Sequence, residues 1–155
     1  MGKSVWGMIL LALVLVLPGC SRTEPEPEED WALTGTFDVV STAQDGRTVT
    51  YTMRGVEGKY GFIDDPFVAG QGNKYMWHFW DESGKYGGKK LQVEATNREG
   101  KTVSVFEGGL GGPNNTATQH TPSTMMLPSA GRWRMTVRVG GEVVGHIVVD
   151  VKAPG

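Results

Sequence analysis

The sequence predicts an all-β domain of the β-sandwich class, and three observations carry this prediction. Runs rich in Val, Thr, Tyr, Trp and Phe recur at intervals of about ten residues over 31–155, separated by Gly, Asp and Asn. No stretch keeps the 3.6-residue apolar period of an amphipathic helix. A tryptophan-bearing central run and a C-terminal hairpin favour two packed sheets, with about seven to nine antiparallel strands, over a closed barrel.

The runs that fit strands are residues 35–42, 47–54, 58–63, 74–80, 89–97, 101–107, 124–127, 131–139 and 142–152. Asp45-Gly46 and Gly140-Gly141 are typical of hairpin turns, because both pairs tolerate a positive φ. Residues 108–122 are predicted to form a long polar loop, which is either functional or disordered.

The strand at 131–139 has the clearest alternation of side chains. Its apolar face consists of Trp133, Met135, Val137 and Val139. Its polar face consists of Arg132, Arg134, Thr136 and Arg138. Such a pattern predicts a half-buried strand with its arginine face in water.

The run at 74–80 is apolar on both faces, which predicts a central strand. Its aromatic residues, with one from the following loop, form a candidate binding surface: Tyr75, Trp77, Phe79, Trp80 and Tyr86. Two readings stay open, since a surplus of aromatic residues either fills a core or provides a platform on which a ligand stacks.

The N-terminal residues have the pattern of a bacterial lipoprotein signal. Lys3 precedes an apolar stretch at 8–17 that is too short to cross a bilayer core of about 30 Å. Leu17-Pro18-Gly19 leads into Cys20, which is the only cysteine and so has no disulfide partner in the chain. The pattern predicts a signal peptide over 1–19 and a covalent lipid on Cys20, with no other cofactor.

Residues 20–30 follow the signal as an acidic segment with two prolines, which predicts an extended tether. The whole chain has a formal net charge of −2. This segment carries Glu24, Glu26, Glu28, Glu29 and Asp30 against Arg22, so the rest of the chain is close to neutral. A neutral domain lacks the basic footprint of a nucleic-acid-binding protein. We therefore expect a single domain over 31–155 and no nucleic-acid partner.

Metal binding is an alternative function. His120, Met125 and Met126 could supply imidazole and thioether ligands of the kind that suit copper, and His78 and His146 are further candidates. Their spacing is not diagnostic, because methionine is also an ordinary core residue.

Catalytic patterns are weak. Residues 95–102 match a loose phosphate-loop pattern, but a strand follows where the phosphate loop requires a helix. No serine lies in a nucleophile elbow. The sequence favours a protein that is not an enzyme.

Taken together, the Cys20 motif, the acidic tether and the segments 74–80, 127–135 and 147–152 resemble small lipoproteins of Gram-positive bacilli that carry an immunoglobulin-like domain of unknown function. The resemblance implies an immunoglobulin-like sandwich, anchored through lipid to the extracytoplasmic side of the cell membrane. It brings no catalytic residues. We expect a non-catalytic envelope protein that binds an envelope protein or a wall polysaccharide.

Overall fold

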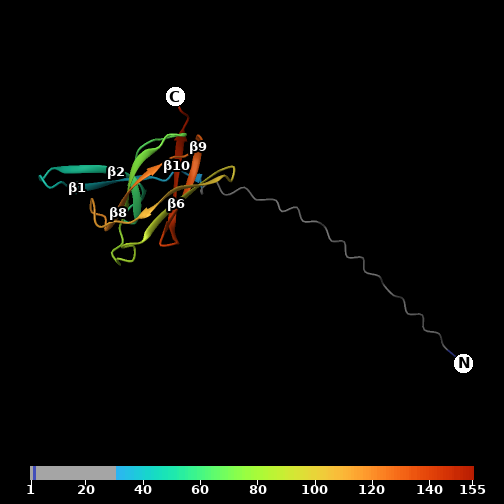
Figure 1. Cartoon of the computed structure of the whole chain (residues 1–155), viewed down its shortest axis with the longest axis horizontal. Coiled ribbons are helices and arrows are strands. Elements are labelled where there is room, and N and C mark those ends of the chain that lie inside the picture. The colour runs from blue at the N-terminus through green and yellow to red at the C-terminus, as the bar shows by residue number, and fades with distance from the viewer. Residues whose placement is uncertain (1, 3–30) are drawn as a thin grey trace.

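The computed structural model describes Gly2 and residues 31–155 (Figure 1). The predicted signal peptide, the lipidation of Cys20 and the tether to residue 30 therefore fall outside the described residues, apart from Gly2. Within the described part of the chain, no helix has the length and hydropathy needed to span a membrane.

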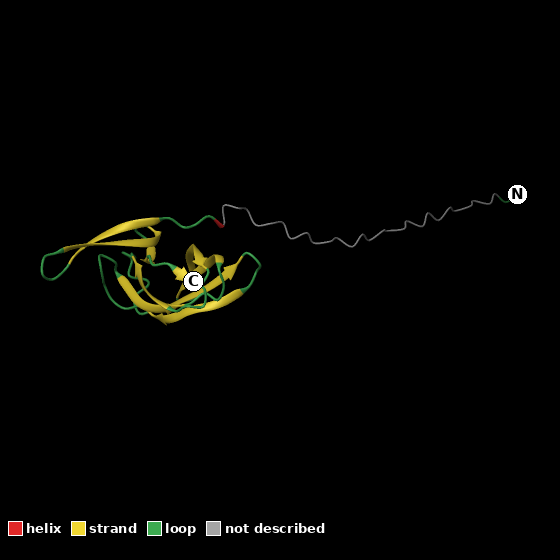
Figure 2. Cartoon of the chain, turned by 90° about the horizontal axis from the view of Figure 1, so that it is seen from above, coloured by secondary structure: helices red, strands yellow, loops and turns green. Residues whose placement is uncertain are grey.

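The described residues form two five-stranded sheets, which face each other across one core (Figure 2). The first sheet has the order β1-β2-β3-β5-β8: β1 Thr36–Thr42, β2 Thr48–Val56, β3 Tyr60–Ile63, β5 Asn73–Phe79 and β8 Gln119–Met125. The second has the order β4-β10-β9-β6-β7: β4 Phe67–Val68, β6 Lys90–Asn97, β7 Thr102–Gly109, β9 Gly131–Val139 and β10 Glu142–Lys152.

The strand order is that of an immunoglobulin domain, which confirms the predicted fold class. In that fold, strands A, B and E share one sheet, and strands C, F and G share the other. Here β3, β5 and β8 take the places of A, B and E, while β6, β9 and β10 take those of C, F and G. The hairpin of β1 and β2 is an addition at the edge of the first sheet, and it extends away from the body of the domain (Figure 1).

Strand β4 is a short element that the sequence did not reveal, and it pairs in parallel with β10 through Phe67 and Val151. The chain changes sheets between β3 and β4, at Asp64-Asp65-Pro66. Proline lacks the N–H that a ladder needs, so Pro66 ends the pairing of the first sheet and permits the switch.

Strand β8 corrects the predicted boundaries. The sequence placed a strand at 124–127 after a long loop, whereas β8 begins at Gln119 and ends at Met125. Its inward residues Gln119, Thr121 and Ser123 are buried but polar, so the apolar alternation that marks a strand is missing. Pairing with β5 holds this strand in the sheet although its inward residues are polar. The hydroxyl of Ser123 also donates to the Tyr75 carbonyl of β5, at 2.8 Å.

The core confirms the alternation predicted for β9. Trp133, Met135 and Val137 are fully buried, and the indole of Trp133 donates to the Ser129 carbonyl at 2.9 Å. The opposite face is partly covered, because Trp31 lies over Arg134 with 5.3 Å between the guanidinium carbon and the ring centre. The arginine face is therefore less open to water than the sequence predicted.

Candidate functional site

Three connections meet at the end of the sandwich remote from Trp31. They are the β5–β6 loop, the β7–β8 loop and the β9–β10 turn, brought together by the pairing of Phe79 with Gln119 and by the hydrogen bond from the Gly140 N–H to the Lys90 carbonyl at 2.9 Å. Trp31 lies at the opposite end, where its carbonyl accepts from Arg132 near the start of β9. By analogy of position, the first and last of these connections correspond to antigen-contacting loops of antibody variable domains.

The predicted aromatic surface is wrong for three of its five members. Tyr75, Trp77 and Phe79 are at most 2% exposed and belong to the core. They occupy alternate positions of β5, so all three point between the sheets. Trp80 follows on the other face and is partly exposed, as is Tyr86 in the next loop.

The indole of Trp80 is held on several sides. The Phe37 ring meets it edge to face, with centroids 5.9 Å apart, and the His78 ring stacks on it at 6.1 Å. Its Nε1 donates to the Thr116 hydroxyl at 3.2 Å. Trp80 thus has a fixed ring plane while part of its surface stays open, which is the condition for a stacking platform.

Two cavities follow one another along β1 and share the β7–β8 loop as a wall. The first, of about 270 Å³, is lined by Phe37, Asp38, Val39, Val40, Glu57, Gly58, Trp80 and Thr116. The second, of about 340 Å³, is lined by Ser41, Thr42, Ala43, Gln44, Val49, Tyr51, Asn114 and Asn115. We call the two together the ribbon groove, since the β1–β2 ribbon forms one side of it.

The wall of the ribbon groove contains strained backbone. Asn115 and Thr116 have φ values of 46° and 70°, which place both in the left-handed region. Asn tolerates this region, but a β-branched threonine there is unusual and costs energy. Reciprocal backbone hydrogen bonds between Asn114 and Ala117, at 3.1 and 2.9 Å, hold this turn in place.

His78 lies on the outer face of β5 and contacts two residues that line the groove, Trp80 and Asn115. It is fully buried, and Asn115 lies 3.3 Å from its Nε2 while the Met76 carbonyl lies 3.1 Å from its Nδ1. This arrangement assigns the proton to Nδ1, which donates to Met76, and leaves Nε2 to accept from Asn115. Burial lowers the pKa of His78, with the bond to Met76 opposing, so the ring is neutral near pH 7.

The β5–β6 loop is organised by Asp81. Its carboxylate accepts from the Ser83 N–H at 3.2 Å, from the Ser83 hydroxyl at 2.5 Å and from the Tyr86 N–H at 2.8 Å. Burial raises the pKa of Asp81, but these donors together outweigh that effect and the pKa is lowered. The carboxylate is therefore a turn-forming acceptor, and it helps to position Tyr86.

The predicted copper ligands do not converge. His120 pairs with His78 on the outer face of β8, and the Gly112 carbonyl lies 2.7 Å from its Nδ1. Met125 is fully buried on the inner face, whereas Met126 is 51% exposed beyond the strand. Among the described residues, no group of three or more His, Cys, Asp or Glu side chains is placed to hold a metal ion.

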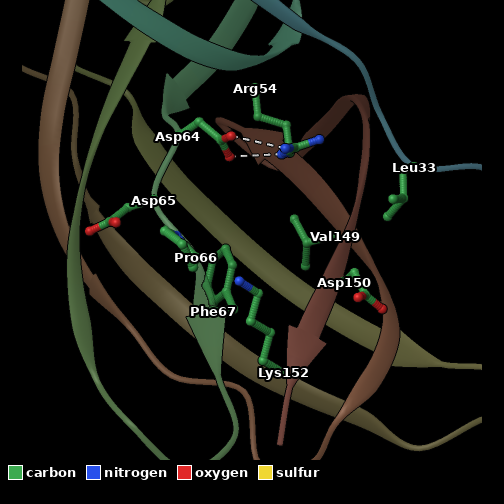
Figure 3. A pocket seen from close by; sticks show the side chains of 9 residues that line it. All are labelled: Leu33, Arg54, Asp64, Asp65, Pro66, Phe67, Val149, Asp150 and Lys152. Carbon is green, nitrogen blue, oxygen red and sulfur yellow. Dashed lines mark hydrogen bonds and ion pairs between the residues drawn. The ribbon is translucent and has the colours of Figure 1, made fainter.

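A further cavity, of about 230 Å³, lies where the chain switches sheets (Figure 3). Arg54 of β2 forms a bidentate ion pair with Asp64, at 2.8 Å and 2.9 Å, and also donates to the Thr34 carbonyl. These contacts join the added hairpin, the sheet switch and the start of the domain. We interpret this cavity as a structural junction, because the arginine in its wall is committed to these partners.

Residues 28–149 match the family model of a domain of unknown function, DUF4871. The chain belongs to this family. The X-ray crystal structure of a candidate lipoprotein from Bacillus anthracis resembles this DUF4871 domain with a TM-score of 0.54 at 22% sequence identity, covering 79% of this chain and 86% of that chain. No curated protein matches the chain. At the level of family and fold, the resemblance to lipoproteins of bacilli with a domain of unknown function is confirmed.

The ribbon groove itself was not predicted from the sequence. Trp80 was named as a candidate, but β1, β2 and the Thr116 turn were not. The one local signal was the polar 108–122 segment, whose function the sequence left open. What forms the groove is the approach of the β1–β2 ribbon to the β7–β8 loop, two segments far apart in sequence.

Proposed function

We propose that this DUF4871 protein is a non-catalytic, lipid-anchored protein of the cell envelope that binds a wall polysaccharide in the ribbon groove. The observation that carries the proposal is Trp80, a partly exposed indole that lines the groove and is held in a fixed plane. An aromatic face of this kind offers an apolar stacking surface to the C–H face of a sugar ring.

The remaining lining supports a neutral sugar polymer in preference to a charged one. Beyond Trp80, the groove offers neutral hydroxyl and amide groups: Ser41, Thr42, Gln44, Tyr51, Asn114, Asn115 and Thr116. Such groups both donate and accept, so they match the hydroxyls of a sugar. The only charged residues in the described lining are Asp38 and Glu57, which would repel a polyanion.

The location of the groove agrees with an anchor at Cys20. The described domain begins at Trp31, and the groove lies at the other end of the sandwich. A fully extended tether over residues 20–30 would span at most about 40 Å. A domain anchored in this way would present the groove away from the membrane and toward the wall.

The anchor is tested by replacing Cys20 with Ala in the full chain. We expect incorporation of labelled fatty acid to be lost and the protein to be released from the membrane fraction. If the wild-type chain takes up no label and is found free in the medium, the anchor proposal is wrong.

The binding function is tested by co-sedimentation of the full chain with purified cell walls. Trp80→Ala should weaken binding about tenfold, the equivalent of one stacking contact. Gln44→Ala provides a second variant in the groove that leaves the Trp80 contacts intact. Val143→Ala is the matched control, because Val143 is 49% exposed but does not line the groove. Equal binding by all the variants and the wild type would refute the proposal.

A further inference from the structure

The ribbon groove is bordered by the backbone edge of strand β1. Its two cavities are lined by consecutive residues of this strand, 37–40 in the first cavity and 41–42 in the second. Successive side chains of a strand point to opposite faces, so a cavity that met one face would be lined by alternate residues only. The unbroken run therefore places the edge of β1 along the groove.

The hydrogen-bonding groups on this edge face no partner strand. Among the described strands, β1 pairs with β2 alone, in one register from Thr36 to Thr42. At either end of β1, the Gly35 carbonyl and the Ala43 N–H bond across the ribbon to the β2 side, at 3.3 Å and 2.8 Å. Alternate residues of an antiparallel strand direct their N–H and C=O groups to the same side. The backbone groups of Asp38 and Val40 therefore point away from β2.

This edge differs from the other three sheet edges of the described domain. Natural edge strands are protected by proline, by a bulge or by being very short. Strand β8 contains Pro122, β7 pairs with β6 through a bulge, and β4 has two residues. Strand β1 has seven residues, no proline and no bulge. The unprotected edge is thus the one that borders the ribbon groove, which favours a ligand that pairs with backbone groups.

We propose that the free edge of β1 binds the acetamido groups of an N-acetylated amino-sugar polymer. This rests on the proposed function and names the class of wall polysaccharide. An acetamido group has one N–H and one C=O, so it can pair with the C=O and N–H of one edge residue as a neighbouring strand would. Asp38 and Val40 offer two such positions, roughly 7 Å apart along the strand. Trp80 lines the same cavity, and its stacking surface favours a sugar ring over a peptide strand.

The test compares two oligosaccharides of equal length and linkage, one of N-acetylglucosamine and one of glucose. Their binding is measured on the full chain, kept soluble in a non-ionic detergent. The acetylated oligosaccharide should bind about tenfold more tightly, because glucose cannot make the reciprocal pair of hydrogen bonds.

Variants of the edge test the contact itself. Val40→Pro removes an N–H that points away from β2, so the ribbon should keep its pairing while the preference for the acetylated oligosaccharide is lost. Val40→Ala is the matched control, because it keeps the N–H and shortens a side chain that is already 57% exposed. Thr36→Pro controls for proline on the same edge, since Thr36 does not line the groove. Both controls should keep the preference.

Amide hydrogen exchange on the wild-type chain gives a measurement that needs no variant to fold. The N–H groups of Asp38 and Val40 should exchange rapidly in the free chain and about tenfold more slowly with the acetylated oligosaccharide. The Val39 N–H faces β2 and should be slow in both states. Exchange at Asp38 and Val40 that the oligosaccharide leaves unchanged would overturn the proposal.

The remaining outcomes separate this proposal from the proposed function. Equal affinity for the two oligosaccharides, or binding of neither by a chain that still co-sediments with cell walls, would overturn the role of acetamido groups alone. Tighter binding of a wall peptide that carries no sugar would overturn it in favour of a peptide strand on the same edge. The proposed function fails separately, when co-sedimentation with walls does not depend on Trp80.

Discussion

Trp80 donates from its indole nitrogen to the hydroxyl of Thr116 at 3.2 Å, and this contact joins the end of β5 to the strained turn of the β7–β8 loop. Thr116 keeps a φ of 70° while making it. A fold that retains such a conformation in the wall of the ribbon groove gives up some stability for a defined geometry there. The strained conformation of Thr116 therefore helps to set the orientation of the Trp80 ring.

The variant Thr116→Gly separates the backbone strain at Thr116 from the contact that its hydroxyl makes with Trp80. Glycine accepts a positive φ without strain, so the free energy of unfolding should stay the same or rise by up to about 1 kcal/mol. Wall binding should weaken, because Trp80 loses its partner. Asn115→Gly is the comparison, with a smaller gain in stability since Asn tolerates this region. Chemical denaturation and co-sedimentation on the same samples check both parts. A Thr116→Gly variant that binds as well as the wild type would show that the contact has no role in binding.

Trp133 should be among the most damaging core positions. It is fully buried, and Trp133→Ala should cost about 3–5 kcal/mol because it leaves a large cavity. Arg134→Ala should cost about 0.5–1 kcal/mol, since the arginine lies over the Trp31 ring. Equal losses in denaturant-induced unfolding would contradict the assignment of the two faces of β9.

The strand β9 and the core could be predicted from the sequence because each inward residue is apolar and each outward one polar. The same criterion missed β8, whose inward residues Gln119 and Thr121 are polar. It also misplaced the aromatic surface, since Phe79 and Trp80 are adjacent in sequence but lie on opposite faces at the end of β5. The groove depends on the path of a ribbon relative to a distant loop, and no local pattern records that path.

Gly145 directly follows the β-bulge of β10, which lies between Val143 and Gly145, and a side chain at Gly145 would have no room. An added Cβ would lie 1.9 Å from the Tyr60 hydroxyl oxygen, and that hydroxyl donates to the His146 carbonyl at 3.2 Å. Gly145→Ala should therefore destabilise the domain by about 1–3 kcal/mol. Gly109→Ala is the matched control, because no atom lies within 4 Å of its added Cβ. Similar Tm values for the two variants would show that the bulge can move aside.

The neutral, buried His78 predicts a loss of stability in acid. Its folded pKa is below the ordinary value of 6.5, so the folded state binds fewer protons than the unfolded state as the pH falls below that value. The free energy of unfolding should therefore fall as the pH drops from about 6.5 toward the folded pKa of His78, and it should stop falling below that pKa. Thermal unfolding of His78→Gln should lose this part of the pH dependence, whereas His120→Gln should retain most of it. Identical pH profiles for His78→Gln and the wild type would contradict the assignment.

The central claim, that a wall glycan stacks on Trp80, is tested most directly by acrylamide quenching of tryptophan fluorescence. Trp31, Trp77 and Trp133 are at most 6% exposed, so among the described tryptophans Trp80 is the one open to the quencher. Solubilised wall glycan should protect the full chain from quenching and should have no such effect on Trp80→Phe. Quenching of the wild-type chain that stays the same at saturating glycan would contradict the claim.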